Sequence, residues 1–346
     1  MQISLEFIAN AIDGELIGSG DLLLTDISFL NEAGPDELAF AINKDDCEEL
    51  ELEDYCKAGA VIVPDYYAGT RINVIKVKNM QLAIAKAIGL FNPKEIVQPA
   101  ISPQADIHSS ASIGEAVYIG PFVSIGANSV VGDRTVIRSG ALVGNDVVIG
   151  DDTTLSYRVL VLPRVRIGNR VVVQPGTLIG GDGFSYVKDG ETWVKIPDAG
   201  TVVIEDDVSL GAYNTIERGN IGQTLIRQGV KTGNSVHIGH NSYIGRNTSV
   251  GMGAGIASNT FVGDNVFIGP KAGISEKLSI GHGATIGPKA GIITDVENGG
   301  SVFGTPGMSR AAWMRSASLI PKLSSMRKEI SRLSRRIEEL QSRLED

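Results

Sequence analysis

Aliphatic residues return at every sixth position through most of this chain. From Ile101 to Ile292 the repeated position is Ile, Val or Leu in 28 of 29 repeats, and Thr232 is the exception. The pattern is interrupted twice, after Ile179 and after Ile216. A helix needs a period of about 3.6 residues and a flat strand a period of about 2, so a period of six predicts short strands joined by tight turns.

A hexapeptide repeat of this kind is typical of a parallel β-helix, in which three hexapeptides build one coil. Each aliphatic residue then packs between its equivalents in the coils above and below, and the core becomes a column of Ile and Val. With coils about 4.8 Å apart, the repeats predict roughly ten coils and a prism of about 45 to 50 Å. The repeats themselves indicate a rigid scaffold. Chemistry is expected where the pattern breaks or where a rare side chain points outward.

The segments on either side of the repeats predict two further parts. Residues 1–98 indicate a small α/β domain with strands at 60–64 and 73–77 and a helix at 81–88. Residues 99–308 form the β-helix, and 309–346 form a helical tail with Pro321 in the first turn of its helix. The apolar residues of the tail alternate steps of four and three, as in a coiled-coil seam: Leu319, Leu323, Met326, Ile330, Leu333, Ile337, Leu340 and Leu344.

Charge and cysteine usage narrow the possible partners. The chain has a formal net charge of −9, but residues 310–336 hold eight Lys or Arg and one Glu. Such a basic segment is a solvated helix face or a surface for an acidic partner, and it lacks the aromatic platforms expected for nucleic acid. Cys47 and Cys56 indicate neither a disulfide framework nor a zinc site. No signal peptide or transmembrane segment is apparent, so a cytoplasmic protein is expected.

Histidine is scarce, with only His108, His237, His240 and His282. His240 and His282 both lie two residues after a core Ile, and we expect them to point outward, exposed and able to act as general bases near neutral pH. A lone surface His is usually inert. The sequence His-Ile-Gly-His-Asn at 237–241 is more informative, because it places two imidazoles within four residues on a rigid scaffold.

Several segments carry a family resemblance in addition to the repeats. They are Gly-Asp-Gly-Phe-Ser-Tyr at 181–186, Trp-Val-Lys-Ile-Pro at 193–197, Ile-Glu-Arg-Gly at 216–219, His-Asn at 240–241, and Gly-Thr-Pro at 304–306 followed by Trp313 and Arg315. In this order they resemble the UDP-3-O-acylglucosamine N-acyltransferases of lipid A synthesis over nearly the full chain. The resemblance implies a left-handed parallel β-helix, against the usual right-handed crossover, and a homotrimer with active sites between subunits.

That family moves a 3-hydroxyacyl chain from acyl carrier protein to the 2-amino group of a UDP-linked, 3-O-acylated glucosamine. The resemblance therefore implies two partners, acyl carrier protein and a UDP-linked amino sugar. It implies no bound cofactor, since the 4′-phosphopantetheine arrives on the acyl carrier protein, and it implies no metal.

The resemblance also assigns roles to individual residues. His240 matches the general base, and Ser258, one coil later, stands where a Gly backbone N–H of the family stabilises the oxyanion. The remaining substrate-binding residues that it indicates are Phe40, Asn43, Asp46, Asn234, His237, Lys277, Asp182, Phe184 and Tyr186. Arg310, Arg315 and Lys322 lie just after the last repeat and are expected to bind the acidic carrier protein.

Four positions depart from the family pattern, and Ser258, in place of the family's Gly, is the first of them. Gly233 stands where an Asp usually orients the imidazole, Lys277 replaces a second His beside the sugar, and Asp46 replaces a Tyr on the uracil side. If position 233 is otherwise equivalent, Gly233→Asp is expected to raise activity. His237 is reminiscent of the related sugar O-acyltransferases.

Two alternatives therefore stand beside the N-acyltransferase. One is a paralogue that acylates another nucleotide sugar or position, and the other is a non-catalytic trimer that binds a sugar nucleotide. Loss of the Asp and the second His favours the non-catalytic trimer, whereas retention of His240 and of 182–184 opposes it. The tail seam taken alone favours a two-stranded coil. The larger β-helix interface favours a trimer, with the tail packed onto the prism.

Overall fold

The computed structural model of the protein describes residues 2–52, 55–69, 72–93 and 95–345, with their side chains except at 339 and 342–345. Two compact units make up the chain, Met1–Ile96 and Val97–Asp346.

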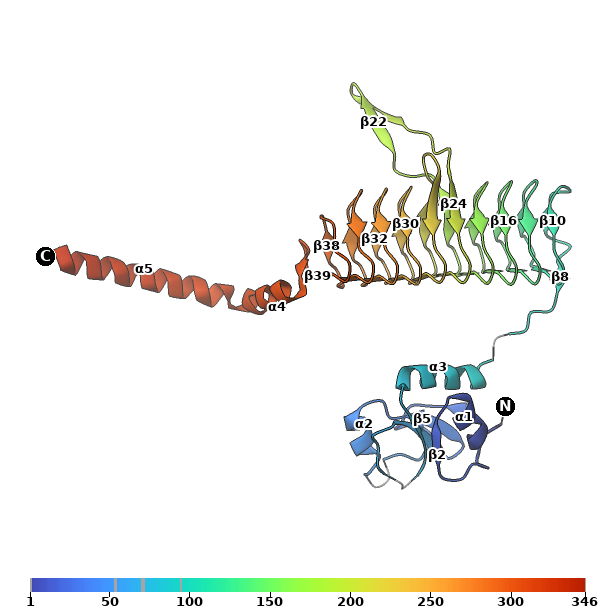
Figure 1. The fold of residues 1–346 in the computed structure, drawn as a ribbon, viewed down its shortest axis with the longest axis horizontal. Helices are drawn as coiled ribbons and strands as arrows, with labels where there is room; N and C mark the ends of the chain where they lie inside the picture. Colours follow the sequence, from blue (N-terminus) through green and yellow to red (C-terminus); the bar gives the residue numbers. More distant parts are fainter. Residues whose placement is uncertain (1, 53–54, 70–71, 94, 346) are drawn as a thin grey trace. The chain divides into compact units, whose positions relative to one another are not determined.

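The first unit is a small α/β domain (Figure 1). Among its described residues, five strands form one sheet in the order β2-β7-β6-β5-β4, and β1 pairs with β3. Both faces of the sheet are covered, because Ala60 and Ile62 of β6 pack with residues of α1 and α3 while Val61 and Val63 pack with residues of α2. The elements are β1 (Ile3–Ser4), α1 (Leu5–Ala11), β2 (Glu15–Ile17), β3 (Leu23–Leu24), β4 (Asp26–Ile27), β5 (Glu37–Phe40), α2 (Lys44–Glu49), β6 (Ala60–Pro64), β7 (Asn73–Val77) and α3 (Met80–Phe91). The strands expected at 60–64 and 73–77 and the helix expected at 81–88 are confirmed.

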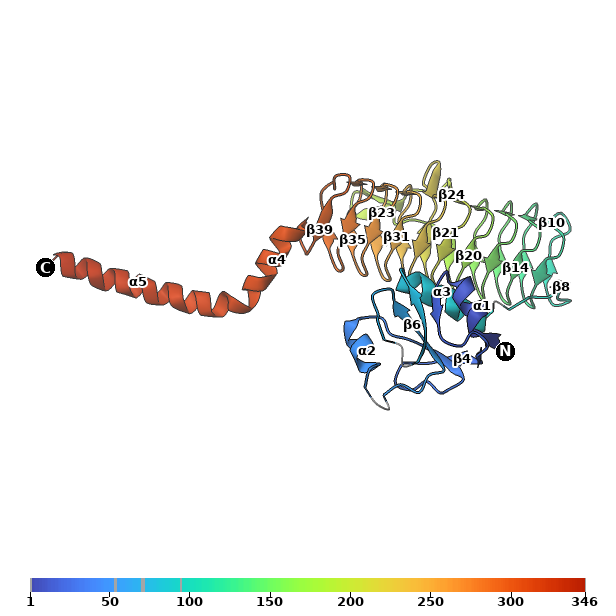
Figure 2. The same ribbon diagram turned by 60° about the horizontal axis from the view of Figure 1, so that its bottom comes forward.

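The second unit contains a left-handed parallel β-helix, as expected (Figure 2). Its described strands form three parallel sheets. One sheet holds β10 (Ser112–Ile113), β13 (Val130–Val131), β16 (Val148–Ile149), β19 (Arg166–Ile167), β24 (Thr201–Ile204), β27 (Gln223–Ile226), β30 (Tyr243–Ile244), β33 (Phe261–Val262) and β36 (Ser279–Ile280). A second holds β9 (Asp106–Ile107), β12 (Ser124–Ile125), β15 (Leu142–Val143), β18 (Leu160–Val161), β21 (Leu178–Gly181), β26 (Thr215–Glu217), β29 (His237–Ile238), β32 (Gly255–Ile256), β35 (Gly273–Ile274) and β38 (Gly291–Ile292).

The third sheet also receives the chain as it leaves the repeats. It holds β8 (Ala100–Ile101), β11 (Tyr118–Ile119), β14 (Val136–Ile137), β17 (Thr154–Leu155), β20 (Val172–Val173), β25 (Ser209–Leu210), β28 (Lys231–Thr232), β31 (Ser249–Val250), β34 (Phe267–Ile268), β37 (Thr285–Ile286), β39 (Ser301–Phe303) and β40 (Met308–Ser309). The last two strands of this sheet pair antiparallel.

The repeated aliphatic residue faces the core, as the period predicts. Ile119 pairs with Ile137 and Ile137 with Leu155, so neighbours along the axis are 18 residues apart in the sequence. All three side chains are fully buried. Each coil thus buries its aliphatic residues against the adjacent coils, and these contacts supply most of the stability of such a solenoid.

Polar side chains hold many of the turns of neighbouring coils together. The Asp133 N–H donates to the carboxylate of Asp151 at 2.9 Å, and the Asp151 N–H donates to the amide oxygen of Asn169 at 2.8 Å. Arg134 binds Asp152 through two nitrogens, at 2.7 and 2.8 Å. The bonds from the Asp133 and Asp151 N–H groups satisfy backbone donors that the short strands leave unpaired, and the Arg134–Asp152 pair adds a side-chain link between coils.

Two excursions leave the β-helix at the interruptions of the repeat. The first, between β21 and β24, contains an antiparallel hairpin of β22 (Tyr186–Asp189) and β23 (Thr192–Lys195), which projects from the coils in Figure 1. The second is a short loop, 218–222, between β26 and β27.

Helices follow the last coil. They are α4 (Arg310–Leu319), the 3₁₀ turn η1 (Ile320–Lys322) and α5 (Leu323–Glu345). Pro321 lies in η1 rather than in the first turn of the tail helix, because Ser309 caps an earlier helix through the Ala312 N–H. The apolar seam from Leu319 to Leu340 is exposed, so the described part of α5 does not pack onto the prism. Leu344 lies outside the described side chains.

Candidate active site

The two excursions meet at one corner of the β-helix. Strand β21 pairs with β26, and β26 pairs with β29. The first excursion begins after β21, the second begins after β26, and His240 follows β29. The two excursions and the segment that carries His240 therefore continue from three adjacent strands. The interruptions of the repeat thus lie next to the candidate base.

His240 is held at three points. Its Nε2 lies 3.1 Å from the Ser185 hydroxyl, its Nδ1 lies 3.2 Å from the amide oxygen of Asn241, and its backbone N–H donates to Glu217 Oε2 at 3.0 Å. The side chain is buried, with 8% of the residue exposed. The expectation that His240 is exposed was therefore wrong, because the first excursion covers the ring.

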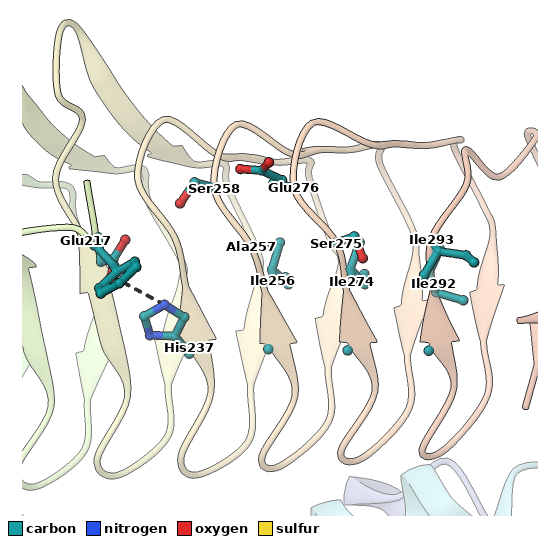
Figure 3. A pocket seen from close by; sticks show the side chains of 14 residues that line it. Glu217, His237, Ile256, Ala257, Ser258, Ile274, Ser275, Glu276, Ile292 and Ile293 are labelled. Atoms are coloured by element: carbon teal, nitrogen blue, oxygen red, sulfur yellow. Dashed lines mark ion pairs between the residues drawn. The ribbon is translucent and has the colours of Figure 1, made fainter. Parts of the chain in front are cut away.

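Glu217 links the two histidines of the 237–241 segment. Its carboxylate is buried and lies in the coil before theirs. While Oε2 accepts the backbone N–H of His240, Oε1 lies 3.5 Å from His237 Nε2, as the dashed line in Figure 3 shows. A buried carboxylate placed this way fixes the backbone of one histidine and faces the ring of the other.

The first excursion passes directly over the His240 ring. A Cβ added at Gly183 would lie 2.7 Å from His240 Cδ2, so no larger residue fits there without moving the ring. Beside it, Asp182 pairs with Lys195 at 3.2 Å, and the rings of Phe184 and Tyr186 lie 5.3 Å apart.

A polar network extends from the base into this excursion. Asn220 donates to the Ser185 hydroxyl at 3.0 Å and to the carboxylate of Asp198. That carboxylate is fully buried and binds Lys195 Nζ at 2.7 Å. The hydrogen bond to Asp198 is the main reason why the pKa of Lys195 is raised. The excursion is thereby fixed beside the base.

An apolar groove of about 720 Å³ runs from this corner across the following coils (Figure 3). Its floor contains Gly255, Gly273 and Gly291, which are in register on β32, β35 and β38. A Cβ at Gly255 or Gly273 would meet nothing within 4 Å, so the missing side chains leave open space. The other lining residues are Phe184, Glu217, His237, Ile256, Ala257, Ser258, Ile274, Ser275, Glu276, Ile292 and Ile293. His237 therefore lines the groove, while His240 lies outside this described lining.

Ser258 occupies the place expected for an oxyanion donor. It lies one coil after His240, lines the groove and is partly exposed. At an equivalent turn, a side chain of the next coil accepts the backbone N–H. There the Ala127 N–H donates to the side-chain oxygen of Asn145 at 2.9 Å. Within the described residues the Ser258 N–H has no such acceptor. An uncapped N–H at the groove is available to bind a developing oxyanion.

Two of the predicted substrate-binding residues do not join this group. The amide oxygen of Asn234 accepts the Ala212 N–H at 2.9 Å, so it serves the coil-to-coil contacts. Lys277 is exposed, lies 3.7 Å from Glu276 and is not among the described lining residues of the groove.

Position 233 has no room for the carboxylate that orients the imidazole in the family pattern. A Cβ at Gly233 would lie 2.6 Å from the Met252 backbone nitrogen, so an Asp fits only if the backbone shifts.

The predicted uracil-binding residues all lie in the first unit. Phe40 ends β5 and packs partly against the domain core. Asn43 and Asp46 form the capping box of α2, in which the Asn43 side chain accepts the Asp46 N–H at 2.9 Å and Asp46 accepts the Asn43 N–H at 3.2 Å. Asp46 thus has a structural role in the helix cap, which accounts for a carboxylate at this position.

The basic residues predicted for carrier-protein binding are exposed. Arg310 and Arg315 lie on α4, and Lys322 lies in η1. The Arg310 guanidinium stacks 5.8 Å from the centroid of the Phe303 ring. In contrast to the seam of α5, this part of the tail is attached to the last coil, because α4 contacts β39 and β40.

The sequence did not assign roles to Ser185, Glu217, Asn220 or Asn241. Glu217 carried a signal, because an acidic residue follows the core Ile at a place where Gly is common. Ser185 and Asn220 carried none, because their contacts with the base depend on how the excursions fold back.

Comparisons with known proteins agree with this fold. Residues 110–145 match the model of the bacterial transferase hexapeptide family (six repeats). The chain is 38% identical to UDP-3-O-acylglucosamine N-acyltransferase of Anaeromyxobacter dehalogenans over 346 residues, which cover 98% of this chain and 97% of the relative. It is 40% identical to the Syntrophus aciditrophicus protein of the same name over 342 residues, 99% of this chain and 94% of the relative.

Among solved structures, a UDP-N-acetylglucosamine acyltransferase from Bacteroides fragilis aligns with a TM-score of 0.49 at 26% identity, over 61% of this chain and 73% of that chain. The UDP-N-acetylglucosamine O-acyltransferase of Moraxella catarrhalis aligns with a TM-score of 0.46 at 25% identity, over 62% and 77%.

The β-helix and its hexapeptide repeats are typical of the bacterial hexapeptide transferases. The identity to relatives over nearly the whole chain is more specific, and the chain belongs to the UDP-3-O-acylglucosamine N-acyltransferase family. In the part of the chain that is described, no helix has the length and apolar character of a membrane span.

Proposed function

We propose that this enzyme transfers a 3-hydroxyacyl chain from acyl carrier protein to the 2-amino group of a UDP-3-O-acyl-glucosamine in lipid A synthesis. The observation that carries the proposal is an imidazole fixed at both ring nitrogens and at its backbone, close to an apolar groove with an uncapped N–H. The names of the full-length relatives support the same substrate.

The proposed reaction begins with His240 as general base. A protonated amine cannot attack a thioester, so His240 Nε2 takes a proton from the sugar amine as the new C–N bond forms. The Ser258 N–H stabilises the resulting oxyanion. When the intermediate collapses, the C–S bond breaks and the imidazolium returns its proton to the departing thiolate, which leaves the carrier's 4′-phosphopantetheine as a thiol.

The hydrogen bond between Ser185 and His240 implies a rearrangement on binding. Nε2 is occupied by the Ser185 hydroxyl at 3.1 Å, and a substrate amine must take this place. We therefore expect 183–185 to shift when the acceptor binds, with Gly183 giving the backbone the freedom to move.

The groove suits the acyl chain of the donor. Its lining is mainly apolar, and its glycine floor allows a methylene chain to lie against the backbone. Each buried CH₂ contributes about 0.8 kcal/mol, so a chain of a dozen carbons supplies much of the binding free energy.

Partners follow from the same proposal. The exposed Arg310, Arg315 and Lys322 would attract the acidic carrier protein. Phe40 and Asn43 would contribute to uridine binding, and three copies of the chain would assemble with sites between subunits.

A second candidate function is transfer to a sugar hydroxyl. It is favoured by one observation, namely that His237 rather than His240 lines the groove and lies 3.5 Å from the buried Glu217 carboxylate. In this case His237 would be the base and the product would be an ester.

Acyl transfer from hydroxyacyl carrier protein to a panel of UDP-amino sugars tests the proposal. The expected product is an acylated UDP-3-O-acyl-glucosamine whose new linkage survives mild base, since an amide is stable there and an ester is not. A product whose new linkage is lost in mild base would establish the second candidate. If no sugar is acylated, the protein is a non-catalytic binding protein.

A further inference from the structure

The missing carboxylate at position 233 raises the question of what orients the base. An imidazole that accepts a proton at Nε2 must carry its hydrogen on Nδ1, and a fixed acceptor at Nδ1 selects this tautomer and stabilises the imidazolium. Gly233 has no side chain to do so, and the Met252 backbone leaves no room for one. The acceptor must therefore come from elsewhere in the fold.

Asn241 supplies an acceptor at the required atom. Its Oδ1 lies 3.2 Å from His240 Nδ1. The orientation of this amide is fixed by two backbone groups, because Nδ2 donates to the Ile221 carbonyl at 2.6 Å and Oδ1 accepts the Asn220 N–H at 3.0 Å. If the amide were turned the other way, its NH₂ group would face the Asn220 N–H and its oxygen would face the Ile221 carbonyl, and neither pair can form a hydrogen bond. The oxygen therefore faces the ring, and Nδ1 carries the hydrogen.

The second excursion is built to hold this amide. Arg218 anchors its start by donating to the carbonyls of Gly180 at 2.7 Å and Pro163 at 3.1 Å. This guanidinium is buried, which lowers its pKa, and its carbonyl partners compensate part of the cost of burial. The Asn220 carbonyl accepts the Ala199 N–H at 2.8 Å, which ties the excursion to the neighbouring segment.

Glycine makes the close approach possible. A Cβ at Gly219 would lie 2.9 Å from Asn241 Nδ2, so a larger residue there would displace the amide. Asn241 itself has a φ of 58°, a conformation that Asn tolerates better than most residues. The loop at 218–222, which interrupts the repeat after Ile216, thus contacts Asn241.

We propose that Asn241, held by the 218–222 excursion, is the positioning residue of the catalytic base in this enzyme, in place of a carboxylate at position 233. This rests on the proposed function of His240. The titratable and charged groups around the base are Glu217, at its backbone, and His237 beyond that carboxylate. The first excursion adds Asp182, Lys195 and Asp198, which pair with one another, and the second adds Arg218. Ser185, Asn220 and Asn241, which complete the surroundings, are neutral.

Three variants test the proposal in the full-length enzyme. Asn241→Ala removes the acceptor, and we expect kcat to fall about 10- to 100-fold while both Michaelis constants stay within a factor of two, as for a group acting only in the transition state. Asn265→Ala is the matched control, because Asn265 has a similar φ of 55° at an equivalent turn with no contact to the base. It should keep wild-type kcat.

Asn241→Asp keeps an acceptor and adds charge. We expect substantial activity, with the acid limb of the pH profile of kcat/KM moved to higher pH, because a carboxylate stabilises the imidazolium more than an amide does. A carboxylate at 241 that did not face the His240 ring would not move this limb, so the variant remains informative if Asn241→Ala fails to fold.

Equal kcat for Asn241→Ala and Asn265→Ala, or an unmoved pH limb for Asn241→Asp, would overturn the proposal. His240→Ala measured in parallel separates this from failure of the proposed function. If His240→Ala is inactive and Asn241→Ala is not, only the positioning role fails. If His240→Ala is active, the assignment of the base fails.

Discussion

The regular coils between β11 and β19 differ from the coil that carries His240 in the partners that the polar side chains of their turns bind. In the regular coils, the Asp151 side chain accepts the Asp133 N–H and the Asn169 side chain accepts the Asp151 N–H, so the same contact repeats after 18 residues. Around His240, Ser185 and Asn220 come from the two excursions, while Glu217 and Asn241 lie on the coils themselves. The comparison shows that the repeat specifies a scaffold, while the departures from it bring reactive groups together.

Among variants that leave the base itself in place, the largest change is expected from Ser258→Pro, which removes the backbone N–H at the groove. If this N–H stabilises the oxyanion, kcat should fall by about 10² to 10³. Ser258→Ala retains the N–H and should keep near-normal activity. Steady-state kinetics on both variants, with circular dichroism to verify the fold, make the test. Equal loss in both variants would assign the effect to the side chain instead.

Gly273→Leu sharpens the role of the glycine floor. Because a Cβ at Gly273 meets nothing within 4 Å, the fold should tolerate leucine, but the side chain would fill the groove. We expect kcat/KM to fall about tenfold or more for the preferred donor, with a shift toward shorter acyl chains. The measurement is competition between carrier proteins loaded with different chains. An unchanged chain-length preference would place the acyl chain elsewhere.

Arg310→Glu with Arg315→Glu probes a region outside both the coils and the corner. Reversing two exposed charges should raise the Michaelis constant for the acyl carrier protein several-fold and weaken its salt dependence. The constant for the nucleotide sugar should stay the same. If both constants rise together, or neither does, these residues belong to solvated surface or subunit packing.

Leu155→Ala tests the regular region, and its effect on activity should be the smallest. The side chain is fully buried in the repeat core, so its truncation should lower the free energy of unfolding by about 2–5 kcal/mol. The folded enzyme should keep its kcat, because Leu155 lies in the repeat core and is not among the described contacts of His240. Denaturant melts and kinetics on the same preparation separate the two effects. A large loss of kcat would mean that the scaffold and the site are coupled.

The regular part of the molecule could be predicted from the sequence, and much of the corner could not. Burial of one aliphatic residue per hexapeptide is a local pattern, so the period alone located strands such as β14 and β17. The exposure of His240 was mispredicted, because Ser185 and Gly183 reach it from more than 50 residues away. The tail was mispredicted at Pro321, because the cap at Ser309 begins a helix earlier.

Departures from a family pattern were informative even where their explanation was not in the sequence. Asp46 replaces a Tyr and caps α2. Gly233 replaces an Asp at a place where the Met252 backbone allows no side chain without adjustment, so Gly233→Asp is expected to destabilise the coil rather than raise activity. Whether a substitution removes a function or moves it depends on neighbours that only the fold reveals.

The rate of acyl transfer by His240→Ala, compared with His282→Ala, tests most directly the claim that the broken coil carries the chemistry. The two histidines share one phase of the repeat, but His282 is exposed and accepts the Asp264 N–H at 3.0 Å, far from either excursion in the sequence. We predict that His240→Ala lowers the rate by about 10² to 10⁴ while His282→Ala stays within a factor of a few, with both variants folded. A His240→Ala enzyme as active as His282→Ala would contradict the account.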